Sequence, residues 1–346
     1  MTWKELKSTL RWKLAWYANS VDSEHPAYYW NIEPTSACNL RCTICSLDDS
    51  RRKGLMDMTL YEKLLGEAAR MRVTEIRLFL AGEPLIHPRI AEMVRMAADR
   101  GFRTSIHTNA THLTRELSRD LIEARLAYLS FSFDGDNREE YERIRFPAKF
   151  DKVLGNILGF LETKKALGSR TPHTTFQSVR PFDPGRNGPT PLSPEFMAQF
   201  DGLPLDHVRL LTPHNWAGEV SDVPGARPPG TRYVQCRTAW ESMSIGWDGR
   251  VLNCCGDLNG KVVLGDLKKQ TAEEVWRGPL RELRRALANK ERLSSLTLCN
   301  RCDAPWRRRH PVVTELADVT RIRNVVAPLR MFRPKATPPD GKPTES

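Results

Sequence analysis

The sequence of 346 residues predicts an α/β protein whose main body is a partial, TIM-like (β/α)6 barrel. Short apolar runs that suit strands alternate with stretches of helical periodicity, and this alternation predicts a parallel sheet. Six such units fit an open barrel better than a closed one of eight strands. The expected strands are Tyr28–Ile32, Glu75–Leu80, Arg103–His107, Ala127–Phe133, Thr174–Val179 and His207–Leu211, and the expected helices between them are Leu60–Met71, Pro88–Arg100, Glu116–Glu123 and Phe150–Leu167.

Composition and charge narrow the class of protein. A hydrophobic fraction of 40% is ordinary for a globular protein and excludes wholesale disorder. No run of 18 apolar residues could span a bilayer, and Lys4, Glu5 and Lys7 argue against a signal peptide. We therefore expect a cytoplasmic protein whose eight cysteines bind metal or do redox chemistry. The net charge of +11 suits anionic partners, but no recognised nucleic-acid motif accompanies it.

The chain divides into four expected segments. Residues 1–27 hold an N-terminal helix, residues 28–222 the barrel, residues 223–310 a small second domain, and residues 311–346 a basic, largely flexible tail. One apolar face of the N-terminal helix suits docking onto the protein or, as an alternative, a membrane surface. The members of that face are Trp3, Leu6, Leu10, Leu14 and Tyr17.

Turn and cap signals organise the rest. A stretch rich in proline and glycine, residues 180–194, predicts a long loop, and residues 223–231 predict a linker into the second domain. In that domain the Asp248-Gly249 pair between apolar runs predicts a β-hairpin. Thr271 is expected to cap one helix, and a second helix should span Pro279–Lys290.

Polar or glycine-containing turns follow four of the expected strands. In barrels of this kind the chemistry lies at the carboxyl ends of the strands. Four such turns in succession on that rim therefore predict an active site there. The four turns are Glu33-Pro34-Thr35, Ala81-Gly82-Glu83-Pro84, Thr108-Asn109-Ala110 and Ser132-Phe133-Asp134-Gly135.

Three cysteines stand in the loop after the first strand. Cys38, Cys42 and Cys45 form a C-x3-C-x2-C pattern, so their thiolates can reach one metal centre. Structural zinc normally takes four protein ligands, and no fourth cysteine or histidine lies nearby. A four-iron cluster held by three cysteines fits better, because it leaves one iron open to a non-protein ligand.

The string Cys-Asn-Leu-Arg-Cys-Thr-Ile-Cys, which follows a Glu-Pro-Thr strand end, resembles the signature loop of the radical S-adenosylmethionine (SAM) enzymes. The resemblance implies that the open iron chelates SAM. It also implies that the reduced cluster cleaves SAM to a 5′-deoxyadenosyl radical, which abstracts a substrate hydrogen. The later rim turns match the family in order, and they imply a SAM-binding set of Gly82, Glu83, Asn109, Ser132 and Asp134.

The match to the family has departures. Ala81 and Ala110 replace glycines, and Ile44 stands where the family usually has an aromatic side chain against the adenine. The resemblance covers about Tyr28 to Trp216. Arg145 follows the Asp-Gly strand end by ten residues, where the family often has an arginine. It is a candidate catalytic residue that could meet a carboxylate or deprotonate a radical intermediate; the alternative is an arginine on a helix surface.

A second group of five cysteines follows the barrel. Two separated pairs of thiolates suit either a zinc ribbon or a second iron–sulfur cluster, and spacing alone leaves both open. The segment resembles the SPASM extension of radical SAM enzymes or its shorter twitch form, and the cysteine count favours twitch, with one auxiliary [4Fe-4S] cluster. The resemblance implies Cys236, Cys254, Cys299 and Cys302 as its ligands, with Cys255 as the spare thiol or in exchange with Cys254.

The function implied is that of a radical SAM oxidoreductase acting on a small molecule or peptide. The auxiliary cluster would accept an electron, as in a dehydrogenase, and a flavodoxin- or ferredoxin-type donor would supply one. Three alternatives stay open: a peptide maturase that forms a crosslink or epimer, an RNA-modifying radical SAM enzyme, and a zinc-ribbon nucleic-acid-binding protein. We expect no membrane partner, and no nucleic-acid partner under the leading interpretation.

Overall fold

The computed structural model describes residues 3–22, 27–220, 223–226 and 232–307. The predicted tail at 311–346 and most of the predicted linker lie outside these ranges. Residues 1–309 cluster as one compact unit. Within the described ranges no helix is long and apolar enough to cross a membrane.

The predicted parallel sheet is confirmed. Six strands lie side by side in chain order, and every neighbouring pair is parallel, as in an open (β/α)6 barrel. They are β1 (Tyr29–Ile32), β2 (Glu75–Arg77), β3 (Arg103–Thr108), β4 (Tyr128–Ser132), β5 (His173–Val179) and β8 (His207–Leu211). The second strand ends three residues earlier than predicted, because the chain turns there toward Gly82, which packs on the cysteine loop.

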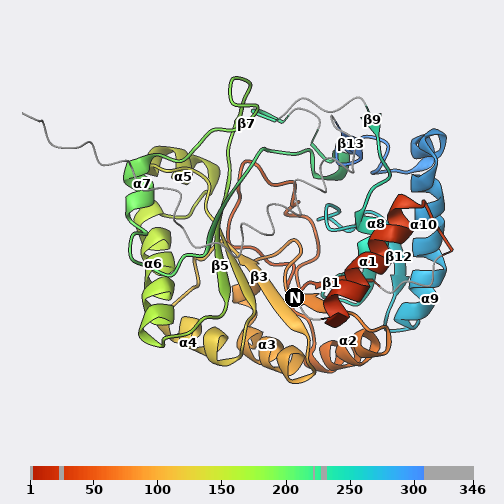
Figure 1. Cartoon of the computed structure of the whole chain (residues 1–346), viewed down its shortest axis with the longest axis horizontal. Helices are drawn as coiled ribbons and strands as arrows, with labels where there is room; N and C mark the ends of the chain where they lie inside the picture. The colour runs from red at the N-terminus through yellow and green to blue at the C-terminus, as the bar shows by residue number, and fades with distance from the viewer. Residues whose placement is uncertain (1–2, 23–26, 221–222, 227–231, 308–346) are drawn as a thin grey trace, which may run out of the picture. The chain divides into compact units, whose positions relative to one another are not determined.

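Helices cover the outer side of these strands (Figure 1). The four predicted helices are found, with ends that differ by at most two residues. They are α2 (Met58–Arg70), α3 (Ile90–Asp99), α4 (Arg115–Glu123) and α6 (Phe150–Ala166). Each presents apolar side chains to the core; in α2, for example, Leu60, Leu64 and Leu65 are buried.

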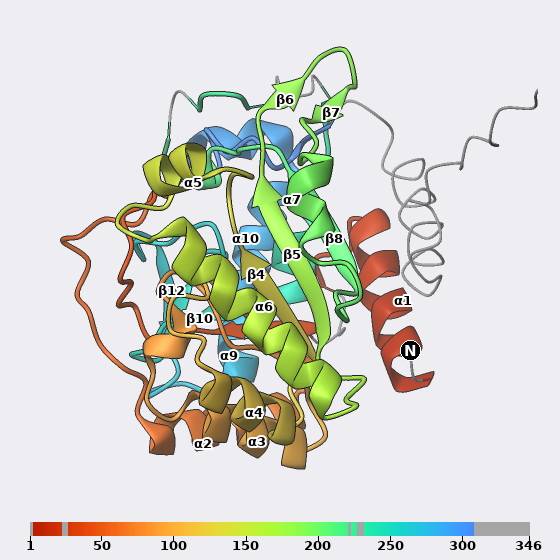
Figure 2. The same ribbon diagram turned by 90° about the vertical axis from the view of Figure 1, so that its left-hand side faces the viewer.

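Sequence patterns missed the short elements. Helix α5 (Arg138–Ile144) follows β4 and is capped by Asn137. The predicted loop at 180–194 contains a small hairpin of β6 (Phe182–Asp183) and β7 (Gly188–Pro189), seen at the top of Figure 2, and ends where α7 (Pro194–Ala198) begins. Elements of two to seven residues are too short to show a periodicity.

The N-terminal helix α1 (Trp3–Tyr17) forms, but its predicted apolar face is wrong in the members whose side chains are described. Leu10, Leu14 and Tyr17 are 50%, 66% and 40% exposed. The face that packs on the protein carries Trp12 and Trp16, each 4% exposed. Their large indole rings bury more apolar area than the leucines would, so they set the orientation of the helix.

The segment after the linker extends the barrel sheet. Strand β10 (Ser242–Ile245) pairs in parallel with β1, and β11 (Arg250–Leu252) and β12 (Val263–Asp266) follow antiparallel. The predicted hairpin is the β10–β11 connection. Thr271 caps α9 (Ala272–Arg277) through a capping box with Glu274, and α10 (Pro279–Ala288) follows.

The remaining elements of this segment are short. Helix α8 (Thr238–Glu241) precedes β10, and β9 (Arg232–Tyr233) pairs with β13 (Trp306–Arg307). Three 3₁₀ turns complete the described chain: η1 (Pro84–Ile86), η2 (Trp216–Gly218) and η3 (Lys290–Ser295). The proposed domain boundaries at 27/28 and 222/223 stay predictions.

Candidate active site

The first cysteine group lies in the loop after β1. Cys38, Cys42 and Cys45 line one cavity of about 150 Å³, and each side chain is partly buried. Burial raises the pKa of all three thiols, to about 11 for Cys38. Because a metal centre binds thiolates, loading this site releases protons.

The donor set fits an iron–sulfur cluster better than a single ion. Among the described residues no three His, Cys, Asp or Glu side chains lie close enough to hold one metal ion. Structural zinc needs four ligands at about 2.0–2.3 Å from one centre. A [4Fe-4S] cluster takes each thiolate on a different iron, so its ligands stand further apart around a shared space. The three thiols around one cavity satisfy this second requirement.

Two neighbouring segments hold the cysteine loop in place. The backbone N–H groups of Arg41 and Thr43 donate to the carbonyls of Phe146 (2.7 Å) and Ile144 (2.9 Å). On the other side Arg51 donates two hydrogen bonds of 2.8 Å to the fully buried carboxylate of Glu33. Burial raises the pKa of Glu33, and the Arg51 guanidinium opposes that rise.

Arg145, the candidate catalytic residue, lies between Asp134 and the first cysteine group. Its Nε is 2.6 Å from Asp134 Oδ2, and its Nη1 is 3.9 Å from Cys42 Sγ. Asp134 is fully buried and also accepts a hydrogen bond of 2.6 Å from the backbone N–H of Val179. The structure therefore places Arg145 inside the site as a buried ion pair beside a cysteine, and not on a helix surface.

Gly82 and Glu83 come together with Asn109. A Cβ at Gly82 would lie 2.2 Å from the carbonyl oxygen of Thr35, so only glycine allows this approach to the cysteine loop. The Glu83 carboxylate accepts hydrogen bonds from Thr108 Oγ1 (2.6 Å) and from the backbone N–H of Asn109 (2.7 Å). Both oxygens thus bind protein donors, and Glu83 joins the ends of β2 and β3.

Asn109 and Ser132 differ in how they meet the other predicted residues. The amide side chain of Asn109 donates to Asn39 in the cysteine loop at 3.0 Å. Ser132 is half-buried at the end of β4, opposite Gln177 of β5. The described contacts do not join Ser132 to the other predicted residues.

The second cysteine group gathers loops from distant parts of the chain. The pKa of the Cys254 thiol is raised by burial first and then by Cys255, Cys236 and Cys299. The pKa of Cys302 is likewise raised by burial and by Cys236 and Cys299. These thiols are therefore within electrostatic reach of one another. Polar N–H groups also approach the sulfurs: Gly256 N lies 3.4 Å from Cys254 Sγ, and Asn253 Nδ2 lies 3.6 Å from Cys299 Sγ.

Hydrogen bonds join the loops that carry the two cysteine groups. Trp216 Nε1 donates to the carbonyl of Ile44 at 2.6 Å, while its neighbour Asn215 donates to the carbonyl of Arg301 at 2.7 Å. Asn259 Nδ2 donates to the carbonyl of Ser46 at 2.8 Å, and Asn259 Oδ1 accepts from the N–H of Asp48 at 2.7 Å. The loop that carries Cys254 is thus fixed to the loop that carries Cys45.

Sequence reasoning missed most of these linking residues. Asn215 and Asn259 stand in loops without a motif, and an asparagine there normally predicts only a turn. The Glu33–Arg51 pair could have been anticipated from the sequence, because a carboxylate buried at the end of a strand needs a cationic partner.

Charged and polar side chains meet inside the barrel. Burial, together with the charges of Arg77 and Arg209, lowers the pKa of His107 to about 3, so its imidazole is neutral at pH 7. Arg209 is exposed and has no ion pair or hydrogen bond within the described chain. The Cys255 thiol lies within electrostatic reach of Arg77: burial raises the pKa of Cys255, Cys236 and Glu241 add to the rise, and Arg77 opposes it. The second cysteine group therefore borders a polar interior.

Comparisons with known proteins agree with this geometry. The profile of the radical SAM superfamily matches residues 32–164, and that of the SPASM iron–sulfur cluster-binding domain matches residues 236–303. GTP 3′,8-cyclase from Chlorobaculum tepidum is 41% identical over 128 residues, which are 36% of this chain. The match spans only 38% of that relative's own length.

Solved structures share the fold. The crystal structure of BtrN in complex with AdoMet and 2-DOIA has a TM-score of 0.54 at 20% identity, and the match covers 80% of this chain and 93% of BtrN. Streptococcus suis SuiB bound to its precursor peptide SuiA has a TM-score of 0.62 at 15% identity, with 86% and 75% covered. Identities this low establish the fold alone.

Proposed function

Since this chain belongs to the radical SAM superfamily and carries a SPASM-type iron–sulfur domain, we propose that it oxidises a polar small molecule by removing hydrogen. Its cofactors are SAM and [4Fe-4S] clusters. When bound, these groups would supply an electron for the cleavage of SAM, and an acceptor for the electron that the substrate loses together with a proton after its hydrogen atom is abstracted.

The observation that carries the proposal is the connection between the two cysteine groups. Trp216 and Asn259 fix the two loops to each other, and Cys255 borders the interior that Arg77 and His107 line. A substrate held in that interior would lie beside the second cysteine group, whose loop is fixed to the loop of the first. This arrangement suits a reaction that takes a hydrogen atom on one side and an electron on the other.

The chain's own residues have assignable roles under this proposal. Cys38, Cys42 and Cys45 would hold the SAM cluster, and Cys236, Cys254, Cys299 and Cys302 the auxiliary one. The Gly82–Glu83 turn, Asn109, Ser132 and Asp134 would surround SAM. Because Glu83 already accepts two short hydrogen bonds from the end of β3, its role is to position that turn.

The polar interior bears on the class of substrate. Arg209 carries a charge without a partner in the described chain, and neutral His107 can donate or accept a hydrogen bond. A polar substrate with an anionic or hydroxyl group would satisfy these side chains, whereas an apolar one would leave them unpaired. This favours a polar small molecule.

A peptide substrate is the second candidate. It is favoured by the likeness to SuiB, whose structure contains the precursor peptide SuiA. The two candidates differ in what Arg209 does. For a polar small molecule, Arg209→Gln should raise KM by about tenfold while leaving SAM cleavage without substrate unchanged.

The first experiment is a count of iron, sulfide and zinc in protein reconstituted without oxygen. About eight irons per chain would support one SAM cluster and one fully ligated auxiliary cluster. About four irons with one zinc would restrict the enzyme to redox-neutral chemistry, and stoichiometric zinc without iron would contradict the enzyme assignment.

Two variants then separate the roles of the two cysteine groups. Cys42→Ala should abolish SAM cleavage, whereas Cys299→Ala should spare part of the SAM cleavage yet stop product formation.

A further inference from the structure

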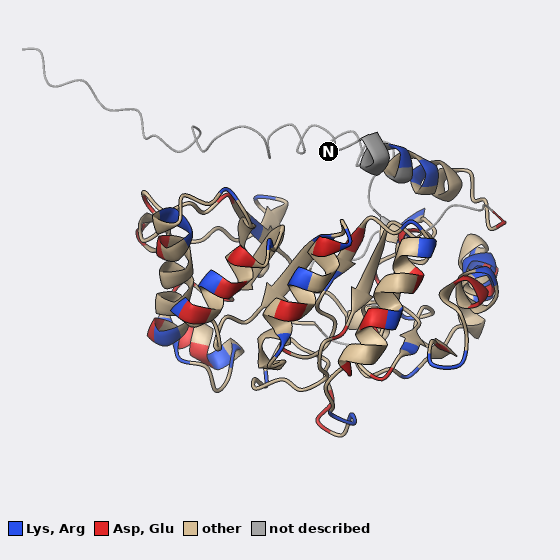
Figure 3. Cartoon of the chain, turned by 90° about the horizontal axis from the view of Figure 1, so that it is seen from below, with Lys and Arg blue, Asp and Glu red and all other residues tan. Residues whose placement is uncertain are grey.

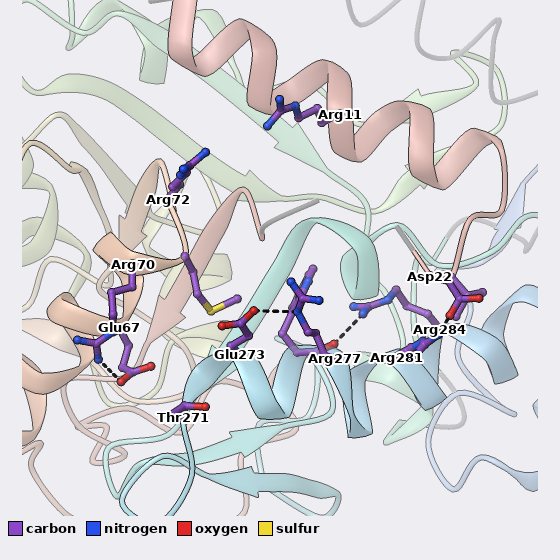
Figure 4. Close-up of a pocket in the computed structure, with 13 residues that line it drawn as sticks. Arg11, Asp22, Glu67, Arg70, Arg72, Thr271, Glu273, Arg277, Arg281 and Arg284 are labelled. Carbon is purple, nitrogen blue, oxygen red and sulfur yellow. Dashed lines mark hydrogen bonds and ion pairs between the residues drawn. The ribbon is translucent and has the colours of Figure 1, made fainter. Parts of the chain in front are cut away.

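A large basic cavity lies outside the barrel, between α1, the end of α2, α9 and α10 (Figure 4). Its volume of about 830 Å³ is in the range of small-molecule sites. Neither cysteine group lines it. Its wall carries six arginines and three carboxylates: Arg11, Arg70, Arg72, Arg277, Arg281 and Arg284, with Asp22, Glu67 and Glu273.

Three of the six guanidinium groups have a carboxylate partner in the wall. Arg70 pairs with Glu67, and Arg281 pairs with Asp22. Arg277 Nε lies 2.9 Å from Glu273 Oε1. All three acidic residues are therefore used, and the charges of the other three arginines are not neutralised by the wall.

Arg284 is the most buried of these three. It is 2% exposed and lies over the ring of Trp276, with its guanidinium carbon 4.4 Å from the ring centroid. Its two terminal nitrogens donate to the carbonyls of Ala239 (3.1 Å) and Trp276 (2.7 Å), but its Nε has no partner. Burial lowers the pKa of Arg284 to about 10, which still leaves it charged at pH 7. A buried, charged donor without an acceptor indicates a missing ligand.

Arg11 and Arg72 complete the set from other elements. Arg11 projects from α1, and Arg72 stands in the turn after α2 (Figure 4). Both are exposed, and neither has an ion pair or hydrogen bond within the described ranges. Three unneutralised positive charges from three parts of the chain thus border one cavity.

We propose that this cavity binds an oligophosphate, of the class of a small molecule that carries a diphosphate group. The planar forks of guanidinium groups match phosphate oxygens, and arginine is the usual residue for such recognition. A diphosphate carries about three negative charges at neutral pH, which equals the charge left over in the wall. The cavity is larger than inorganic diphosphate, so it leaves room for an organic part. This inference is independent of the proposed reaction in the barrel.

The test is calorimetric titration of the reconstituted full-length protein with inorganic pyrophosphate and with ADP at about 0.1 M salt. We expect one site per chain. The double substitution Arg11→Gln and Arg72→Gln should weaken binding by at least about tenfold. Glu273→Gln should strengthen binding, since it removes a competing carboxylate. SAM cleavage should be unchanged in all variants.

A matched control removes the same number of charges elsewhere. Arg119 and Arg170 are exposed, lie outside the cavity and have no ion pair in the described chain. The double substitution Arg119→Gln and Arg170→Gln should leave pyrophosphate affinity within about twofold. Equal weakening by both double variants would show general charge attraction, and no binding below about 1 mM would show no site. Either result would overturn the proposal.

Discussion

At the scale of single residues, the site depends on ion pairs that a sequence motif cannot display. The Asp134–Gly135 turn and Arg145 were each singled out from the sequence, but their pairing across eleven residues depends on how α5 folds back. Ala110 is a case in which the sequence motif did indicate backbone strain. It stands where the family usually has glycine, and it adopts a φ of +57°, which is strained for a residue with a Cβ.

Arg145 should tune the redox properties of the first cysteine group. Its guanidinium is a positive charge 3.9 Å from Cys42 Sγ, and a positive charge favours the reduced, more negative state of a cluster held there. Arg145→Gln should therefore make the reduction potential more negative, on the order of 100 mV for one charge at this range. A potentiometric titration followed by electron paramagnetic resonance measures the shift.

The control for this prediction is Arg143→Gln. Arg143 is exposed on the short helix that ends just before Arg145, and it has no ion pair or hydrogen bond in the described chain, so its loss should leave the potential unchanged. Arg145→Lys keeps the charge and should recover most of the shift. An unchanged potential in Arg145→Gln would contradict the electrostatic role and leave Arg145 a structural residue.

Lys164 and Asp206 should make the outer edge of the sheet sensitive to acid. Lys164 is 2% exposed and its Nζ lies 2.7 Å from Asp206 Oδ2. Burial alone would raise the pKa of Asp206, but hydrogen bonds from Lys164 and Thr174 hold it below its usual value near 3.8. A lowered carboxyl pKa stabilises the fold above the unfolded value, and this contribution is lost as the pH falls through the folded value.

Asp206→Asn leaves the Lys164 charge buried without a counter-charge. We expect a loss of about 2 kcal/mol in the free energy of unfolding at pH 7, less than for a fully buried pair because Asp206 is one-third exposed. Urea unfolding of the wild-type protein and of Asp206→Asn, at pH 7 and near pH 3, measures this loss. The difference should shrink at the lower pH, where wild-type Asp206 is also being protonated; a constant difference would contradict the assignment.

At the scale of elements, sequence periodicity located the long helices and strands but not how they face the core. The helix at residues 3–17 shows why: a helix with apolar residues on more than one side has no single preferred face. Leucine spacing favoured Leu10 and Leu14, whereas packing placed Trp12 and Trp16 inside. Only tertiary contact decides between such faces.

This difference gives a direct test of the α1 orientation. Trp16 is buried, and its Nε1 donates to the carbonyl of Gln235 at 2.9 Å. Trp16→Ala should lower the free energy of unfolding by about 3–5 kcal/mol, while Leu14→Ala should change it by less than about 0.5 kcal/mol. Chemical denaturation of the two variants measures both values. A larger loss of unfolding free energy for Leu14→Ala than for Trp16→Ala would show that the leucine face is the buried one.

At the scale of the whole molecule, the parallel sheet and the grouping of Cys38, Cys42 and Cys45 around one cavity were predictable, because strand–helix alternation and cysteine spacing are local patterns. The joining of the two cysteine segments was not. A change in composition at residues 223–231 predicted a linker, yet β10 beyond it pairs along the whole of β1, from Tyr29 with Ser242 to Ile32 with Ile245. Pairing between strands more than 200 residues apart leaves no signal in one sequence.

The shared sheet predicts that the described part of the chain unfolds as one cooperative unit. Strand β1 lies between β10 and β2, and all four of its residues are buried, so melting of the C-terminal strands would expose the centre of the barrel. Glu33, at the end of β1, also accepts the backbone N–H of Trp247 in the β10–β11 turn at 3.1 Å. The barrel and the C-terminal strands therefore cannot lose structure independently of each other.

Thermal unfolding of the reconstituted protein checks this coupling. Cluster absorbance and tryptophan fluorescence should report the same midpoint, because the proposed cluster ligands and most indole rings belong to the same unit. A chain truncated after residue 222 should not yield a soluble fold. Without β10, the buried strand β1 becomes an unpaired, exposed edge of the sheet. Two separate transitions, or a stable truncated barrel, would instead show that the segment from residue 223 onward is an independent domain that only rests on the sheet.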